Sequence, residues 1–200
     1  MKSKRWTRHA TRICLVTCLL VTGAVAAEKP ARAKEEPQVA AAPDPKDAQQ
    51  HRAVSAKVFL SNNRLSAGGS TRVAVVVDVS RGYHIRAHEG PAQLATAVQL
   101  SNPQLKWTPD KYPAGKTMTL EGEKSQVYEK QVIITGTIVV PANVLAPQEL
   151  DFSLHYQACH VKTGCEVPTD LKMTGTLSVA KQGEAVDSAN TDLFEGLAVR

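Results

Sequence analysis

Two cysteines in the C-terminal third of the chain are the residues whose type and spacing could do chemistry. Cys159 and Cys165 lie in the segment YQACHVKTGCEVP, residues 156–168. Thiols this close in sequence can form a disulfide, and an accessible disulfide undergoes exchange when another thiolate attacks it. His160 and Lys162, which lie between the two cysteines, would stabilise a thiolate. The segment therefore predicts either a redox-active cysteine pair or a purely structural disulfide.

The first 26 residues indicate the compartment in which these thiols work. Five basic residues and no acidic residue precede or border an apolar run over residues 13–25, which ends in small residues. This order is typical of a secretory signal peptide, and the run is shorter than the roughly 20 residues that span a bilayer. We predict that residues 1–26 are cleaved, with an uncleaved membrane anchor as the alternative. Cys14 and Cys18 then leave with the signal, and the remaining pair works in an oxidising compartment.

The charge of the mature chain excludes nucleic acid as an expected partner. The 200-residue chain has 24 basic and 19 acidic residues. Loss of residues 1–26 lowers the number of basic residues to 19, so the mature protein is close to neutral and has no excess of positive charge for binding nucleic acid. No Ser/His/Asp arrangement or glycine-rich phosphate loop has a recognisable spacing, so hydrolase or transferase chemistry is not expected.

Apolar residues recur at every second position in several stretches, which predicts β-strands. In the clearest stretch, valines at 73, 75, 77 and 79 fall on one face. Similar patterns cover residues 96–100, 132–140, 150–156 and 171–179, with Gly, Pro and Asn at the turns between them. Short strands at this spacing, with no helical period, predict an all-β, immunoglobulin-like antiparallel β-sandwich.

The chain divides into four parts by composition. After the signal, residues 27–53 are rich in Ala, Pro, Lys and Glu and are expected to be a disordered linker. Residues 54–180 are the predicted sandwich. Residues 181–200 form a polar tail with one expected helical turn over 192–197, and no membrane span is expected after signal cleavage.

The two cysteines fall at the mouth of one predicted hairpin. Residues that face each other in an antiparallel pair have Cα atoms roughly 4.5–5.5 Å apart, a distance that a disulfide can bridge. Gly164 can adopt positive φ and so close the loop. Closing so small a loop stabilises the fold by only about 2 kcal/mol. Both a redox role and a structural role remain open at this point.

Several further segments agree in order and spacing with a known family. They are YQAC at 156–159 with Cys165 and Pro168 after it, LSAGG at 65–69, RGYHI at 81–85, KYP at 111–113 and VYE at 127–129. Over residues 54–180 the chain resembles the N-terminal domain of the thiol:disulfide interchange protein DsbD.

This resemblance implies a periplasmic immunoglobulin-like domain that acts as a thiol–disulfide oxidoreductase without a cofactor. Cys159 and Cys165 match the redox pair, and Tyr156 and Gln157 match the strand end that supports it. The resemblance implies Cys159 as the cysteine that stays bonded to a partner, although the sequence alone does not decide between the two. Thioredoxin-like periplasmic proteins are the implied partners, the domain is expected to be a monomer, and a link to cytochrome c biogenesis follows.

Two features depart from the family pattern. The family shields its cysteines with a loop that carries an aromatic residue, whereas residues 118–122 here are Met-Thr-Leu-Glu-Gly. Leu120 or Met118 is therefore the expected cap. The full-length family protein continues into a transmembrane domain and a thioredoxin-like domain, which this sequence lacks, so a separate membrane electron donor is expected.

Two other functions compete with electron relay. One is a secreted interaction module of the same fold with a structural disulfide. The other is a periplasmic copper-binding domain, because imidazole and thioether groups suit copper. However, His84 and His88 would lie about 13 Å apart on a strand, and Met173 falls on an apolar face. No metal site is therefore predicted.

Overall fold

Antiparallel strands make up almost all of the chain that the structure describes. The computed structural model describes residues 38–40, 52–120 and 122–198. The predicted signal peptide and most of the predicted linker lie outside these residues. Within the predicted linker, Gln38–Ala40 forms strand β1, which pairs with β2.

One face of the sandwich is a five-stranded sheet in the order β1-β2-β4-β10-β7. The bounds of the strands after β1 are Val54–Leu60 for β2, Ser70–Val79 for β4, Gln131–Val139 for β10 and Lys106–Pro109 for β7. The predicted alternation in β4 is confirmed, because the valines at 73, 75, 77 and 79 are all buried. These side chains form one half of the core.

The other half of the core comes from the sheet β14-β11-β6. Its strands are Thr169–Leu177 for β14, Gln148–Tyr156 for β11 and Ala97–Leu100 for β6. Phe152 of β11 meets Trp107 of β7 edge to face, with ring centroids 5.5 Å apart, so an aromatic pair joins the two sheets. The predicted all-β, immunoglobulin-like antiparallel sandwich is confirmed.

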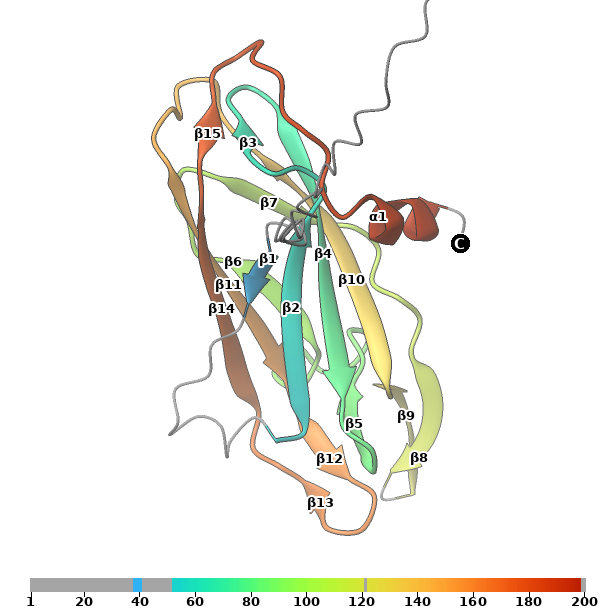
Figure 1. Ribbon diagram of the computed structural model, residues 1–200. Coiled ribbons are helices and arrows are strands. Elements are labelled where there is room, and N and C mark those ends of the chain that lie inside the picture. The colour runs from blue at the N-terminus through green and yellow to red at the C-terminus, as the bar shows by residue number, and fades with distance from the viewer. Residues whose placement is uncertain (1–37, 41–51, 121, 199–200) are drawn as a thin grey trace, which may run out of the picture. The chain divides into compact units, whose positions relative to one another are not determined.

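A third sheet lies at one end of the sandwich and holds both cysteines (Figure 1). Its order is β13-β12-β5-β9-β8. The strands are Gly164–Cys165 for β13, Ala158–His160 for β12, Tyr83–Arg86 for β5, Glu123–Tyr128 for β9 and Lys116–Leu120 for β8. Only Gln157 separates β11 from β12, so one continuous stretch of chain passes from the sandwich into this end sheet. The sandwich therefore fixes the position of the cysteine hairpin.

The segment after residue 180, which the sequence predicts as a polar tail, packs back onto the sandwich and ends in a helix. β15 (Val179–Ala180) pairs in parallel with β3 (Leu65–Ser66), and helix α1 spans Thr191–Ala198. Arg64 forms an ion pair with Glu184 at 3.0 Å. Phe194 of the helix is buried, and Arg72 of β4 lies 5.3 Å from its ring centre. Strand pairing, an ion pair and the buried Phe194 together anchor this segment.

Gly136 of β10 is a position where the fold leaves no room for a side chain. A Cβ built there would lie 2.3 Å from the indole of Trp107 and 2.7 Å from the backbone oxygen of Thr108. We therefore expect Gly136→Ala to lower the free energy of unfolding by about 1–3 kcal/mol, because overpacking displaces the aromatic pair between the sheets. Urea denaturation followed by tryptophan fluorescence measures this.

Gly196→Ala in α1 is the matched control. Nothing lies within 4 Å of a Cβ at Gly196, and alanine favours a helix over glycine by up to about 1 kcal/mol. This variant should be as stable as the parent or more stable. Equal stability of the Gly136→Ala variant and the parent would contradict the described packing.

Candidate functional site

The two cysteines are joined in a disulfide across a short hairpin. Cys159 of β12 and Cys165 of β13 are directly opposite in the antiparallel register, with Cα atoms 3.8 Å apart and an S–S distance of 2.05 Å. Gly164 has a φ of 88°, in the region that disfavours residues with a side chain. Nothing lies within 4 Å of a Cβ there, so backbone conformation and not space is the reason for glycine.

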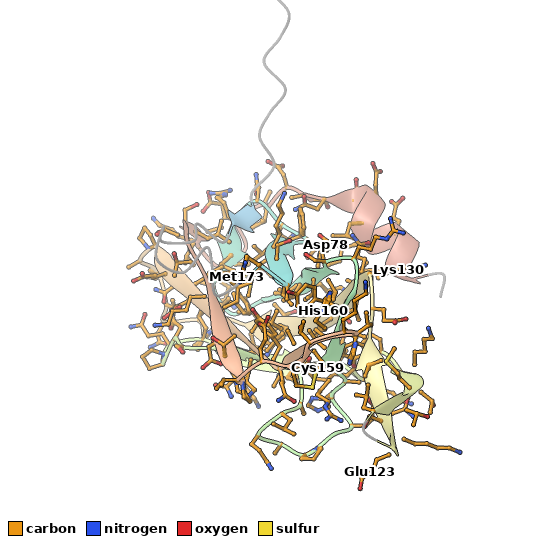
Figure 2. All side chains as sticks on the ribbon, turned by 90° about the horizontal axis from the view of Figure 1, so that it is seen from below. Asp78, Glu123, Lys130, Cys159, His160 and Met173 are labelled. Atoms are coloured by element: carbon orange, nitrogen blue, oxygen red, sulfur yellow. A yellow bond between two sulfur atoms is a disulfide. The ribbon has the colours of Figure 1, made fainter. Side chains whose placement is uncertain are left out.

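The two halves of the disulfide differ in exposure. Cys159 is only 2% exposed, whereas Cys165 is exposed. A thiolate that attacks a disulfide must reach one of its sulfur atoms. Cys165 is therefore the cysteine that an external thiol can approach, while the side chain of Cys159 faces into the protein. Figure 2 views this end of the molecule and labels Cys159 on β12.

A groove of about 370 Å³ runs beside the disulfide. Its walls are the cysteine hairpin, His84 of β5, and the end of β8 with Met118 and Leu120. The structure thus brings both residues that the sequence predicted as a cap next to the cysteine pair. No Phe, Tyr or Trp lines the groove among the described residues.

His160 follows Cys159 in β12 and lines the same groove, and its ring also makes contacts on the hairpin turn. Neighbouring residues of a strand point to opposite faces, and the His160 ring packs against Tyr83, with ring centroids 4.8 Å apart. Its Nδ1 accepts the backbone N–H of Lys162 at 3.3 Å and lies 3.2 Å from the hydroxyl of Thr163. His160 therefore shapes the hairpin turn, although the groove also touches it.

Tyr156 and Gln157 lie directly before the hairpin, at the place where the chain changes sheets. Tyr156 is buried, and burial raises the pKa of its hydroxyl above the usual value. Gln157 donates its side-chain N–H to the backbone oxygen of Glu166 at 3.1 Å, and its backbone oxygen accepts the N–H of Arg86 at 3.2 Å. Gln157 thus links Glu166, which follows Cys165, to β5 at the start of the hairpin.

His84 belongs to the cysteine site, although the sequence suggested a role for this residue only as a copper ligand. It is paired with Cys159 in the register of β5 and β12, is 2% exposed and lines the groove. Burial lowers the pKa of its imidazole, Glu129 opposes this shift and Arg86 adds to it. Its neighbour Cys159 belongs to a strand that is distant in the sequence. No local sequence pattern could therefore have predicted that these two residues meet.

The comparison with known families decides the class of this domain. The family model of the N-terminal domain of the thiol:disulfide interchange protein DsbD matches residues 51–176, which include the hairpin and its neighbouring strands. The chain belongs to this family. A search of curated proteins finds no match.

One solved structure shares this fold, and a second gives a weaker match. The N-terminal periplasmic domain of ScsB from Proteus mirabilis is 12% identical, with a TM-score of 0.55 over 82% of this chain and 58% of that chain. This chain thus spans less than two thirds of the ScsB chain. The reduced N-terminal domain of DsbD from Neisseria meningitidis is 17% identical, with a TM-score of 0.39, and the match covers 72% of this chain and 98% of that one.

In this DsbD-family domain, the candidate copper ligands His88 and Met173, and the further histidine His155, are used in separate contacts. His88 stacks on Tyr112 at 3.7 Å, His155 lies 2.9 Å from Asp170, and Met173 is fully buried in the sandwich. In the part of the chain that the structure describes, no three His, Cys, Asp or Glu residues are grouped so that they could hold a metal ion. In the same part, no helix has both the length and the apolar character to cross a membrane.

Leu120 offers a direct test of shielding at the groove. Truncation to alanine removes apolar atoms beside the disulfide, so we expect Leu120→Ala to increase the rate of reduction by dithiothreitol several-fold. The rate is measured by quenching with an alkylating reagent and mass spectrometry. Leu145→Ala, at an exposed leucine outside the groove, should leave the rate unchanged. An unchanged rate in the Leu120 variant would show that β8 does not shield the cysteines.

Proposed function

We propose that this domain relays electrons through the Cys159–Cys165 pair between a thioredoxin-like protein and a separate membrane donor in the periplasm. The observation that carries the proposal is the exposure of Cys165 in a disulfide that lies on an end sheet, outside the sandwich core. Membership of the DsbD family supports it. As an enzyme, the domain is a thiol–disulfide oxidoreductase that needs no cofactor beyond its own two sulfur atoms.

The position of the disulfide favours exchange over stabilisation. The bond closes a loop with a sequence separation of six residues and joins β12 to the adjacent β13. Such a small loop removes little entropy from the unfolded chain, corresponding to about 2 kcal/mol in the chain-entropy model. The core cluster contains buried residues of both sandwich sheets and, from the end sheet, Ile85, Tyr128 and Ala158, but neither cysteine. The core is therefore built without help from this bond.

Exposure assigns different roles to the two sulfur atoms. A thiolate of the reduced donor attacks the sulfur of Cys165, the Cys159–Cys165 bond breaks, and its electron pair leaves on the sulfur of Cys159. A second donor thiolate then attacks the donor sulfur of the mixed disulfide and releases Cys165. The donor ends as a disulfide and the domain as a dithiol, which has gained two electrons and, after protonation, two protons. The exposure of Cys165 thus favours it over Cys159 as the partner-bonded cysteine, unlike the role that the resemblance implied.

The surface next to Cys165 fits a protein partner. Val161 in the turn is 61% exposed and Val167 after β13 is 83% exposed. Two apolar side chains on either side of an exposed disulfide supply contact area that a partner can bury. A thioredoxin-like protein, whose reactive cysteine must come within bonding distance of Cys165, would cover both valines.

Single-serine variants test the proposal. The test uses a thioredoxin-like protein that lacks its resolving cysteine and whose remaining cysteine is activated as a mixed disulfide with thionitrobenzoate. We expect Cys159→Ser to accumulate a mixed disulfide with this protein, because the exposed Cys165 displaces the thionitrobenzoate anion. Non-reducing electrophoresis and mass spectrometry identify the adduct and the bonded residue. Cys165→Ser is the matched control, and it should give little or no adduct because Cys159 is buried. The proposed relay is wrong if neither variant forms an adduct.

A further inference from the structure

The imidazole of His84 is buried beside the disulfide without a hydrogen-bond partner. Neither of its ring nitrogens bonds to any group of the described chain. Buried polar side chains nearly always have a partner, and an exception in a folded protein calls for an explanation. His84 is also the residue directly across the ladder from Cys159, and both line the same groove. The unpaired nitrogens therefore belong to the residue paired with the cysteine whose sulfur receives the electron pair when the disulfide opens.

The oxidation state of the cysteines determines whether the ring of His84 has a hydrogen-bond acceptor beside it. A disulfide sulfur is uncharged and a weak acceptor. When the bond opens, the sulfur of Cys159 carries the electron pair of the broken bond and becomes an anion inside the protein. A buried anion is costly unless a donor faces it, and hydrogen bonds to a charged group are stronger than neutral ones. The structure described here is the oxidised form, in which this partner is missing.

We propose that His84 donates a hydrogen bond to the Cys159 thiolate that forms when the disulfide opens. This inference rests on the proposed exchange reaction and adds a residue to it. The imidazole N–H stabilises the leaving sulfur as the donor thiolate bonds to Cys165. No electron passes to the ring, and the proton that finally converts the thiolate to a thiol comes from solvent or from the donor's second thiol, which must lose its proton before it attacks the mixed disulfide. In the reduced domain, one orphaned nitrogen of His84 thus gains a partner.

The charges around His84 fit a neutral donor. Burial holds the pKa of His84 below its usual value, so at neutral pH the ring carries one N–H and no charge. Arg86 disfavours the charged ring, and Glu129 favours it more weakly than burial opposes it. On the groove side the charged or titratable neighbours are Lys162, His160 and the cysteines themselves. A neutral N–H is therefore the group available to the thiolate.

Two substitutions at His84 separate donation from packing. His84→Phe retains an aromatic ring but cannot donate, whereas the side-chain amide of His84→Gln can. We expect the phenylalanine variant to shift the equilibrium with glutathione about tenfold toward the disulfide, which is about 30 mV for a two-electron couple. The glutamine variant should remain within about twofold of the parent, or less than about 10 mV by the same conversion. His155→Gln, which removes an imidazole outside the groove, is the control and should cause no shift.

A second readout excludes a merely structural effect. In the Cys165→Ser background, the pKa of the Cys159 thiol should rise in the phenylalanine variant and not in the glutamine variant. Thiolate ultraviolet absorbance as a function of pH measures it. An unchanged equilibrium and thiol pKa in the phenylalanine variant would overturn the inference, as would a glutamine variant that behaves like phenylalanine.

Nitrogen NMR of the parent protein tests the same claim without any variant that could misfold. With histidine labelled at both ring nitrogens, reduction should shift one His84 resonance while the ring stays neutral. If reduction leaves both resonances unchanged, His84 does not contact the thiolate. A disulfide that glutathione cannot reduce would instead contradict the proposed relay, and the spectra recorded with a stronger reductant would still decide the role of His84.

Discussion

The antiparallel pairing of β12 with β13 on one side and with β5 on the other is the constraint on which the site depends. It places Cys159 opposite Cys165 and opposite His84 at the same time. Residues that are directly paired on neighbouring strands share a face of the sheet. Cys159 therefore lies on the same face as Cys165 and His84. A shift of one residue in this register would turn Cys159 to the other face and separate all three.

The core of the sandwich stabilises the fold, whereas the reactive disulfide lies in the end sheet. The two large sheets bury valine, leucine and aromatic side chains in a core that also includes Ile85, Tyr128 and Ala158 of the end sheet but neither cysteine. The end sheet is attached where β11 continues into β12, and the backbone of Gln157 bonds to β5 at this junction. The hairpin can therefore exchange its disulfide for two thiols while the core remains intact. This arrangement suits a domain that must cycle between two covalent states.

Local patterns in the sequence predicted the strands well and the site only in part. The alternating valines of β4 and the hairpin around Gly164 depend on neighbouring residues, so they could be read from the chain. The exposure of Cys165 relative to Cys159 and the proximity of His84 depend on pairing between distant strands. His160 is adjacent to Cys159 in sequence and yet faces Tyr83, because strand alternation separates neighbours. Burial of Phe194 likewise joined an apparently polar tail to the fold.

The equilibrium reduction potential of the Cys159–Cys165 pair is the most direct test of a redox role. It is obtained by incubating the full chain in glutathione buffers of known composition and counting free thiols by mass spectrometry. We expect a potential well above about −300 mV, in the range of disulfide exchange catalysts. A potential below this value would identify a structural disulfide and rule out the relay.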